Sequence, residues 1–269
     1  MKVIVSHDVD HITFWEHRKD LIIPKFFVRN AIECATGNIS FSEMMRRFGP
    51  VCSNRWHRLP ELIAFDLAEK IPSTFFFGMN NGCNLNYSLR NASFWIQYAA
   101  DHGFDVGVHG IGYHNSEEIR KEFSSFKTIS GKTGFGIRMH YLRQTIDTLK
   151  YLSEAGYSFD STVRTPLSPY KIGEMWEFPL HIMDGDIMQH GKPYGNKSLK
   201  QAQLLTKSVI DQVFENQSPY LTVLFHDLYF DHSFSVWYDW YHWIIEYLKS
   251  SGFEFTGYHQ ALKDLDDKR

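Results

Sequence analysis

The sequence predicts an α/β fold built around a parallel sheet. Short apolar runs typical of buried strands recur along the chain and alternate with longer segments of helical periodicity, the pattern of βαβ units. Charged and imidazole side chains follow directly after several of these runs, where a buried strand would end. Because sites in parallel sheets and barrels lie at the carboxyl ends of the strands, this pattern also predicts where a site would form.

Length and composition are those of an ordinary folded protein. The 269 residues suit one large domain or two small ones, and a hydrophobic fraction of 43% is enough for a substantial core. A net charge of −3 provides no basic field for nucleic acid and no polybasic tail for a membrane surface. No apolar run approaches the roughly 20 residues of a transmembrane helix. The N-terminus does not resemble a signal peptide, and three widely spaced cysteines predict no disulfide framework, so we expect a cytoplasmic protein.

The elements are expected in a regular order. Strands are predicted at residues 3–5, 74–77, 106–108 and 221–225. Helices are predicted at 59–70, with a proline in the first turn, and at 141–155 and 236–251, each followed by glycine. Residues 11–58 are interpreted as an insertion over one end of the sheet, with helical pieces at 26–35 and 41–48, because the segment is short and lacks a flanking linker. Residues 160–200 are rich in proline and glycine and are expected to be mostly loop.

The first predicted strand ends in a cluster of ionisable groups, Ser-His7-Asp8-Val-Asp10-His11. Two carboxylates and two imidazoles are costly to hold together unless a cation or a proton transfer uses their charge. For this motif alone, a polar strand end that faces water is the alternative.

Two histidines follow the strand predicted at 106–108. His109 comes directly after the strand, and His114 lies five residues further on, with glycines between them. Five residues turn a helix by about 500°, so these imidazoles would converge only in a tight loop. Two unrelated surface histidines are the alternative.

Two more candidates come later in the chain. Arg138 is typical of a guanidinium that orients a carboxylate. His226 ends the strand predicted at 221–225 and is typical of a general acid or base, with a structural histidine as the alternative. One carboxylate and two histidines would make a three-ligand metal site with positions open for water and substrate.

Taken in order, these motifs resemble the polysaccharide deacetylases of the NodB-homology group (carbohydrate esterase family 4). They most resemble the divergent WbmS-like branch found with surface-polysaccharide biosynthesis. The resemblance is carried by Ser-His-Asp8-Val-Asp10, His109-Gly-Ile-Gly-Tyr-His114, Gly-Ile-Arg138-Met-His140-Tyr-Leu-Arg and Val-Leu-Phe-His226. Residues 72–77 resemble the family's second strand. Residues 156–162, with Asp160, and 178–184, with Asp184, resemble further signatures of the WbmS-like branch.

The resemblance implies a single-domain distorted (β/α) barrel over residues 1–269, with about seven parallel strands and the helical insertion at 11–58. It implies a divalent metal, usually Zn²⁺, and an N-acetylated sugar as substrate. The implied activity is metal-dependent hydrolysis of an N-acetyl group on an intermediate of surface polysaccharide or lipopolysaccharide biosynthesis.

The resemblance also implies a role for each site residue. Asp10, His109 and His114 would bind the metal. Asp8 would be the base that activates water, Arg138 would hold Asp8 ionised and oriented, and His226 would protonate the leaving amine.

Three features depart from the family pattern. Val9 separates the two aspartates, the histidine pair is spaced by five residues instead of four, and His140 stands where the family has a proline. His140 thus adds a titratable group near the site, directed at the substrate or at Asp8. The remaining candidates for contacts behind the site residues or with substrate are His7, His11, Asp160 and Asp184.

Other functions stay open. A non-catalytic carbohydrate-binding protein on a deacetylase fold, or another metal-dependent hydrolase, would contain the same residue types. Two histidines and one carboxylate also describe the iron site of non-haem oxygenases. Those ligands normally lie on a β-sandwich, which the alternation of helices and strands does not fit.

Overall fold

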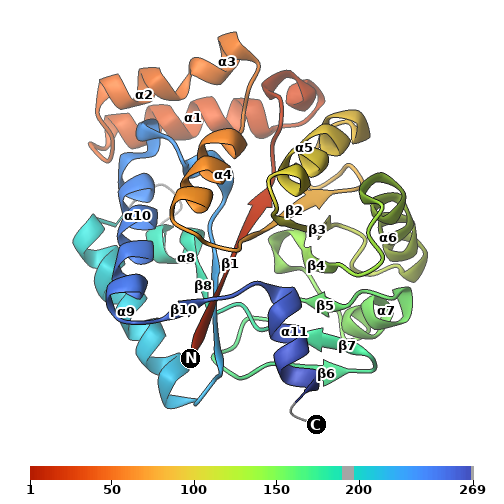
Figure 1. Cartoon of the computed structure of the whole chain (residues 1–269). Coiled ribbons are helices and arrows are strands. Elements are labelled where there is room, and N and C mark those ends of the chain that lie inside the picture. The colour runs from red at the N-terminus through yellow and green to blue at the C-terminus, as the bar shows by residue number, and fades with distance from the viewer. Residues whose placement is uncertain (190–196, 268–269) are drawn as a thin grey trace.

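A computed structural model describes residues 1–189 and 197–267 and places one curled sheet at the centre of the molecule (Figure 1). The strand order is β6-β7-β5-β4-β3-β2-β1-β9-β8, and β10 pairs with the start of β1. Within the described residues, only the β6–β7 pair is antiparallel. The edge strands β6 and β8 do not pair with each other, so the barrel is incomplete. The strands are β1 (Lys2–Val9), β2 (Thr74–Gly78), β3 (Asp105–Gly110), β4 (Gly136–Met139), β5 (Phe159–Asp160), β6 (Tyr170–Ile172), β7 (Met175–Glu177), β8 (Ile182–Met183), β9 (Tyr220–Leu224) and β10 (Glu254–Phe255).

The predicted architecture, a mostly parallel α/β sheet curled as in a distorted barrel, is confirmed. The described residues contain ten strands instead of about seven. The additional strands are only two or three residues long, as β8 and β10 are, and so leave no apolar run in the sequence. The predicted loop region 160–200 holds several of them, and its residues 190–196 lie outside the described part of the chain.

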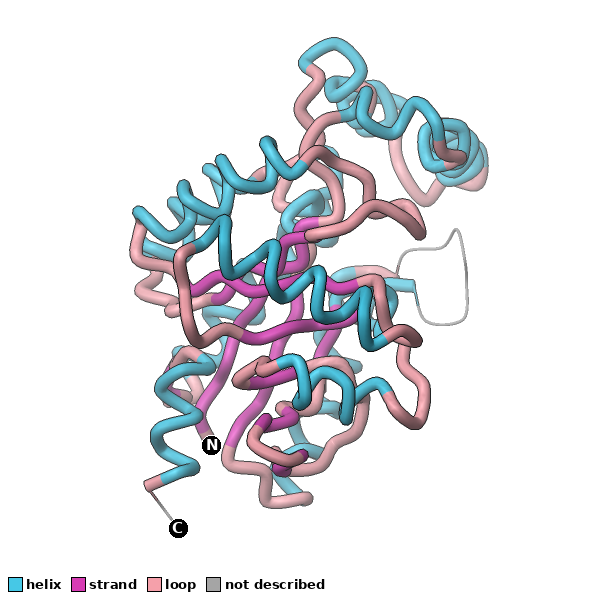
Figure 2. The backbone as a smooth tube through the Cα atoms, turned by 90° about the vertical axis from the view of Figure 1, so that its right-hand side faces the viewer, coloured by secondary structure: helices cyan, strands magenta, loops and turns pink. Residues whose placement is uncertain are grey.

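Helices surround the curled sheet (Figures 1 and 2). They are α1 (Ile22–Ala35), α2 (Phe41–Arg47), α3 (Gly49–Ser53), α4 (Leu59–Ala68), α5 (Leu89–Asp101), α6 (Ser116–Ser130), α7 (Thr148–Ala155), α8 (Asp184–Gln189), α9 (Leu199–Glu215), α10 (Ser235–Ser250) and α11 (Tyr258–Asp266). The helices predicted at 59–70 and 236–251 are confirmed as α4 and α10, with small shifts at their ends.

The helix predicted at 141–155 is wrong in its first half, because α7 begins only at Thr148. Tyr141 and Leu142 adopt left-handed backbone angles, with φ of 58° and 52°, and these break a right-handed helix. Ile146, an apolar residue within the predicted helix, is 98% exposed. The segment after β4 instead folds as a short 3₁₀ turn that lines the cavity described below.

Alternation along β1 separates two environments. Val3 and Val5 belong to the large core beneath the surrounding helices, whereas Ile4 belongs to a smaller aromatic cluster on the inner side of the sheet. Because side chains alternate between faces, Asp8 shares the inner side with Ile4, and His7 faces the helices. This alternation decides which ionisable residue of the first motif can enter a site.

The insertion lies beyond the carboxyl end of β1 and consists of α1, α2, α3 and a 3₁₀ segment, Phe14–Lys19 (Figure 2). Buried Arg47 holds it against the segment after β9. The guanidinium donates to Glu33 at 2.6 Å and to Asn30 at 3.0 Å, and its Nε donates to the carbonyl of Ser233 at 2.7 Å. The expected helical insertion is therefore confirmed, and it is attached to the same end of the sheet as the predicted site.

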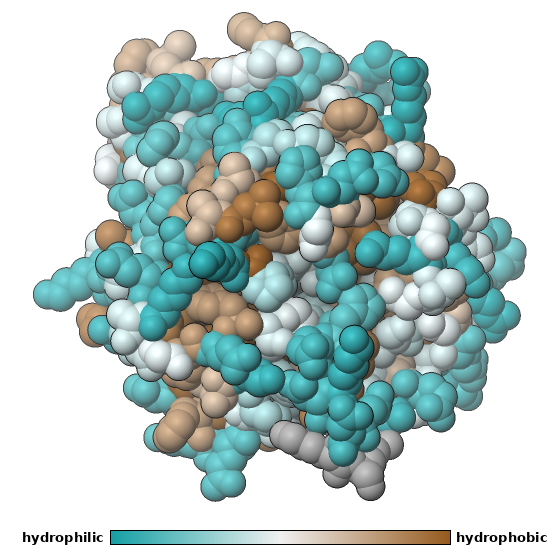
Figure 3. Space-filling view, in the orientation of Figure 1, coloured by the Kyte–Doolittle hydropathy of each residue, from teal (hydrophilic) through white to brown (hydrophobic). Residues whose placement is uncertain are grey.

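One face of the molecule mixes hydrophilic side chains with separate hydrophobic patches (Figure 3). Within the described residues, no helix has the length and apolar character needed to cross a bilayer.

Candidate metal and catalytic site

A cavity of about 470 Å³ opens at the carboxyl ends of β1, β3, β4 and β9. Six ionisable residues predicted from the sequence line it: Asp8, Asp10, His11, His109, His140 and His226. The expectation that strand ends bring these groups together is met by the geometry, because parallel strands place their carboxyl ends along one edge.

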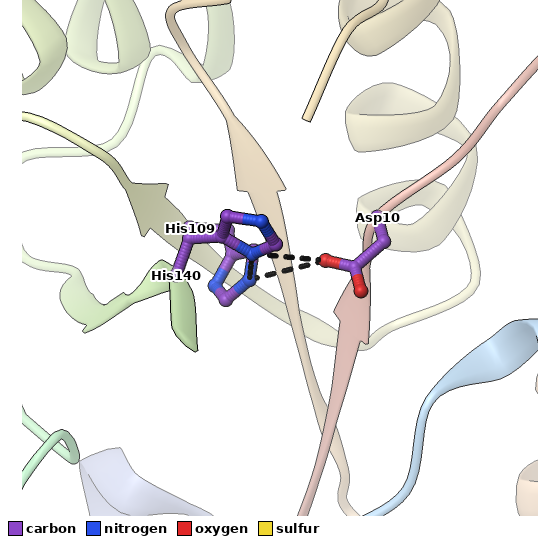
Figure 4. A group of neighbouring side chains, drawn as sticks. All are labelled: Asp10, His109 and His140. Atoms are coloured by element: carbon purple, nitrogen blue, oxygen red, sulfur yellow. Dashed lines mark hydrogen bonds and ion pairs between the residues drawn. The ribbon is translucent and has the colours of Figure 1, made fainter. Parts of the chain in front are cut away.

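Three ligand atoms converge on one point of this cavity (Figure 4). Asp10 Oδ1 lies 3.3 Å from His109 Nε2 and 3.3 Å from His140 Nδ1, and the two ring nitrogens are 2.9 Å apart. The other ring nitrogens are held by backbone carbonyls: His109 Nδ1 donates to Arg138 at 3.0 Å, and His140 Nε2 donates to Cys83 at 3.0 Å. In their neutral forms both imidazoles therefore turn an unprotonated nitrogen towards Asp10.

The chemistry of these three atoms fits a divalent cation. Asp10 Oδ1 is buried and has no hydrogen-bond partner among the described residues. A buried carboxylate oxygen facing two unprotonated nitrogens is unfavourable without a positive charge between them. Burial raises the pKa of Asp10, but positive charge on His140 and hydrogen bonds from His109 and His140 outweigh it and hold that pKa well below its ordinary value, so without a cation the imidazoles themselves supply the positive charge. Two imidazoles and one carboxylate form a three-ligand set of the kind that binds Zn²⁺ in catalytic sites.

The structure does not place His114 in this group. Its side chain is exposed in the loop before α6, contacts the ring of Tyr113 and does not line the cavity. His140 lies beside Asp10 and His109 instead. The physical reason is the path of the chain: the loop after β3 turns towards the surface, whereas His140 continues the inward face of β4, two residues after Arg138.

Asp8 lies under the candidate metal ligands and is paired with Arg138. Arg138 Nη1 donates to Asp8 Oδ1 at 2.9 Å, and Asp8 Oδ2 is 3.7 Å from His109 Nδ1. Burial raises the pKa of Asp8, but the charges of His109 and Arg138 outweigh this effect and lower the pKa below its ordinary value. The carboxylate is therefore kept ionised in a nearly water-free position.

Arg138 is itself completely buried and held by four acceptors. Besides Asp8, its guanidinium donates to the Ser161 carbonyl at 2.9 Å, to Ser161 Oγ at 3.0 Å and to the Tyr258 hydroxyl at 3.0 Å. These four hydrogen bonds fix the orientation of the Arg138 guanidinium. The guanidinium in turn fixes the orientation of the Asp8 carboxylate.

Asp160 lies behind this region and does not line the cavity. It is buried, the Thr162 hydroxyl donates to its Oδ1 at 2.6 Å, and it lies opposite the buried Glu177 on β7. Burial, followed by the charge of Asp160, raises the pKa of Glu177 well above its ordinary value. Asp160 is therefore a structural contact below the site.

His226 is backed by Asp184. The ring nitrogen Nδ1 donates to Asp184 Oδ1 at 2.8 Å, and the backbone N–H of His226 donates to Asp184 Oδ2 at 2.7 Å. Its Nε2 faces the cavity, 3.8 Å from Asp10 Oδ2. Burial lowers the pKa of His226, but Asp184 and then Asp10 outweigh it and raise that pKa well above its ordinary value. The imidazole is thus held as a proton donor.

The two histidines beside the aspartates have different surroundings. His7 is fully buried against the helices, where Nδ1 donates to the Phe225 carbonyl at 2.9 Å and Nε2 lies 2.9 Å from Asp66. Both of its nitrogens are occupied, so it serves the core. His11 lines the cavity, and burial lowers its pKa to about 3.

Three further residues around the site were not among the candidates predicted from the sequence. The Tyr87 hydroxyl donates to the Val9 carbonyl at 2.8 Å and so fixes the end of β1. Asp227 lines the cavity next to His226, and burial raises its pKa to about 7. Glu122 accepts the Ile111 N–H at 3.0 Å after β3. Asp227 directly follows His226 in sequence, and this position next to a predicted site residue could have indicated it. Tyr87 and Glu122 are brought to the site only by the fold.

Comparison with known proteins identifies the fold. No sequence family profile and no curated protein matches the chain. Among solved structures, a protein of Mycobacterium smegmatis assigned as a polysaccharide deacetylase matches with a TM-score of 0.65 and 14% identity, over 99% of this chain and 90% of that one. The chain has the polysaccharide-deacetylase fold. PuuE allantoinase matches with a TM-score of 0.61 and 10% identity, over 97% and 88% of the two chains. A carbohydrate esterase family 4 pseudoenzyme from Bacillus anthracis matches with a TM-score of 0.51 and 12% identity, over 97% and 65%.

These similarities confirm the fold predicted by resemblance. The polysaccharide-deacetylase fold is shared by proteins of different activity, including an allantoinase and a pseudoenzyme. Function therefore has to be argued from the side chains in the cavity.

Proposed function

We propose that the protein is a metal-dependent hydrolase that removes an N-acetyl group from a sugar. The observation that carries this proposal is the convergence, in one cavity, of three ligand atoms, a buried ionised carboxylate and a carboxylate-backed imidazole. Amide hydrolysis needs all three: help in forming a nucleophile, a base for its proton and an acid for the leaving amine.

Asp10, His109 and His140 would hold the cation. A divalent ion such as Zn²⁺ bound there supplies Lewis acidity towards water and the acetyl carbonyl. Asp8 is the proposed base, because it is ionised, fixed by Arg138 and next to the ligand group. A positioned base of this type contributes about 10²–10⁴ in rate.

His226 is the proposed acid. It lies across Asp10 from the histidine ligands, with Asp184 fixing the proton on Nδ1 and Nε2 turned to the cavity. Protonation of the amine as the C–N bond breaks prevents its departure as an unstable anion, and a raised pKa keeps this proton available at neutral pH.

We infer a sugar intermediate of surface polysaccharide or lipopolysaccharide assembly as the substrate, on the sequence resemblance to the WbmS-like branch. The order of the motifs, with Asp160 and Asp184 in their segments, supports this inference. The cytoplasmic location stays a prediction from the sequence.

The test is acetate release from a panel of N-acetylated sugars, including tetra-N-acetylchitotetraose, by the Zn²⁺-loaded protein. Asp8→Asn should reduce turnover by at least about 10²-fold while metal content is unchanged. Asp101→Asn, at the end of α5 and outside the cavity, is the control and should retain wild-type turnover. Full activity of Asp8→Asn would contradict the assignment of the base.

A second candidate is hydrolysis of a different amide. The residues in the cavity act on any amide carbonyl, and the fold is shared with an allantoinase. Adding allantoin and simple N-acetyl amino acids to the panel separates the two candidates, because a preference for a non-sugar amide would replace the sugar proposal.

A further inference from the structure

A chain of hydrogen-bonded side chains runs from the insertion into the cavity. His11 Nδ1 lies 3.1 Å from His17 Nε2, and His17 Nδ1 lies 2.9 Å from Asp20 Oδ2. Asp20 is fixed in turn, because Oδ2 accepts from Asn86 at 2.6 Å and Oδ1 accepts the Ile22 N–H at 2.9 Å. The rings of His11 and His17 are both buried. None of these contacts is needed by the proposed reaction.

The direction of these hydrogen bonds assigns the tautomer of each ring. The carboxylate of Asp20 can only accept, so His17 Nδ1 carries the proton. A buried imidazole is held at lower cost when neutral, and His17 Nε2 is then an acceptor. It accepts a hydrogen bond from the N–H at His11 Nδ1, which leaves His11 Nε2 unprotonated.

The position of His11 directs this free nitrogen to a ligand. His11 lines both the cavity of the candidate metal site and an adjoining cavity of about 670 Å³ walled by α1. Among residues 1–189 and 197–267, the hydrogen bond of the His11 ring is made by Nδ1, and none is found for Nε2. The ring stacks on Trp56, with centroids 4.5 Å apart and planes 18° apart, which fixes the direction of the lone pair.

The candidate metal ligands do not use this nitrogen. The atoms within reach of one ion come from Asp10, His109 and His140, and His11 is not among them. A fixed, unprotonated nitrogen at the junction of two cavities is an acceptor that matches a hydroxyl donor of a bound molecule.

We propose that His11 is a substrate-binding residue whose Nε2 accepts a hydrogen bond from a sugar hydroxyl, with His17 and Asp20 as positioning residues that select the required tautomer. This inference rests on the proposed function and deepens it. The acetyl group would lie at the metal ligands, and a hydroxyl of the same sugar or of its neighbour would lie at His11, towards α1.

The tautomer is tested without turnover. Histidine-selective ¹⁵N labelling of the metal-free protein gives long-range ¹⁵N–¹H spectra in which protonated and unprotonated ring nitrogens differ in shift, and His11→Phe assigns the resonances. We expect His11 to carry its proton on Nδ1 in the wild type. In Asp20→Asn we expect the ¹⁵N shifts of the His17 ring nitrogens to change, and those of His11 to change with them. A proton on His11 Nε2 in the wild type would overturn the proposal.

The substrate role is tested by kinetics with tetra-N-acetylchitotetraose. A hydrogen bond made equally to the bound sugar and to the transition state affects mainly KM, so His11→Phe should raise KM about tenfold or less while kcat falls by a smaller factor. Asp20→Asn should give the same pattern, more weakly. His114→Phe replaces an exposed histidine outside the cavity and is the matched control.

The outcomes separate the two proposals. A wild-type KM in His11→Phe, whether or not kcat falls, overturns the substrate role of His11 and leaves the proposed function intact. A wild-type protein that releases acetate from no sugar overturns the proposed function and, with it, the sugar hydroxyl as the donor to His11.

Discussion

The placement of His140 instead of His114 in the ligand group leads to a direct prediction about metal affinity. In His140→Ala, one of three ligand atoms is removed, at a site where it lies 2.9 Å from His109 Nε2 and 3.3 Å from Asp10 Oδ1. In His114→Ala, an exposed ring outside the cavity is removed. The two variants therefore differ in whether the histidine belongs to the converging group, and also in burial, since His140 is buried and His114 is exposed.

The magnitude follows from the number of ligands. Structural zinc sites with four ligands bind with about 10–16 kcal/mol, or about 2.5–4 kcal/mol per ligand. Because 1.4 kcal/mol is a factor of ten, we expect His140→Ala to weaken Zn²⁺ binding by about 10²–10³-fold. His114→Ala should stay within about twofold of the wild type, since an exposed side chain far from the ion contributes little.

The assay is competition for Zn²⁺ against a chromogenic chelator, with the free energy of unfolding of each metal-free variant measured in urea. His140 is buried, so His140→Asn is included to keep a polar group near the Cys83 carbonyl without a ring nitrogen. Equal losses in His114→Ala and His140→Ala, or wild-type affinity in both His140 variants when they are folded, would refute the ligand group described above.

Three other predictions follow from contacts around the cavity. Asp184→Asn removes the carboxylate that contributes most to the raised pKa of His226, so the alkaline limb of the pH profile of kcat/KM should move to lower pH. If that limb does not move, His226 is not the acid. Arg138→Met leaves the buried carboxylate of Asp8 without its cation, so the free energy of unfolding in urea should fall by about 3–5 kcal/mol. A loss below about 1 kcal/mol would mean that other groups compensate the charge of Asp8. The raised pKa of buried Glu177 means that the folded state binds a proton more tightly than the unfolded state, so stability falls as pH rises from the unfolded-state pKa through the folded-state one. Glu177→Gln should flatten this fall in urea unfolding above about pH 4.3, whereas an unchanged slope would show that Glu177 holds no extra proton.

Much of the site could be predicted because strand ends leave a clear sequence pattern. Asp8, Asp10, His109 and His226 each follow or end an apolar run, and a parallel sheet brings such positions together. The resemblance implied that Arg138 holds Asp8, and the structure pairs the two residues through one N–H, with the other N–H groups of Arg138 bound to Ser161 and Tyr258.

The exchange of His114 for His140 could not be predicted from spacing alone. It depends on the path of two loops, and in particular on the left-handed backbone at Tyr141, which no sequence pattern indicated. The alternation along β4 was an available signal, because His140 shares the inward face with Arg138. The same limit applies to the helix predicted at 141–155. Its apolar periodicity extends back over Tyr141 and Leu142, which form a turn that lines the cavity.

The two histidine ligands are held by backbone carbonyls, those of Arg138 and Cys83, and this has a consequence for how the protein can change. A carbonyl acceptor survives most side-chain substitutions, so the orientation of the His140 imidazole does not depend on the side chain at position 83. Cys83 has a φ of 54°, and replacement by glycine or asparagine would keep both the backbone path and the acceptor. Position 83 can therefore change its side chain while the orientation of His140 stays the same.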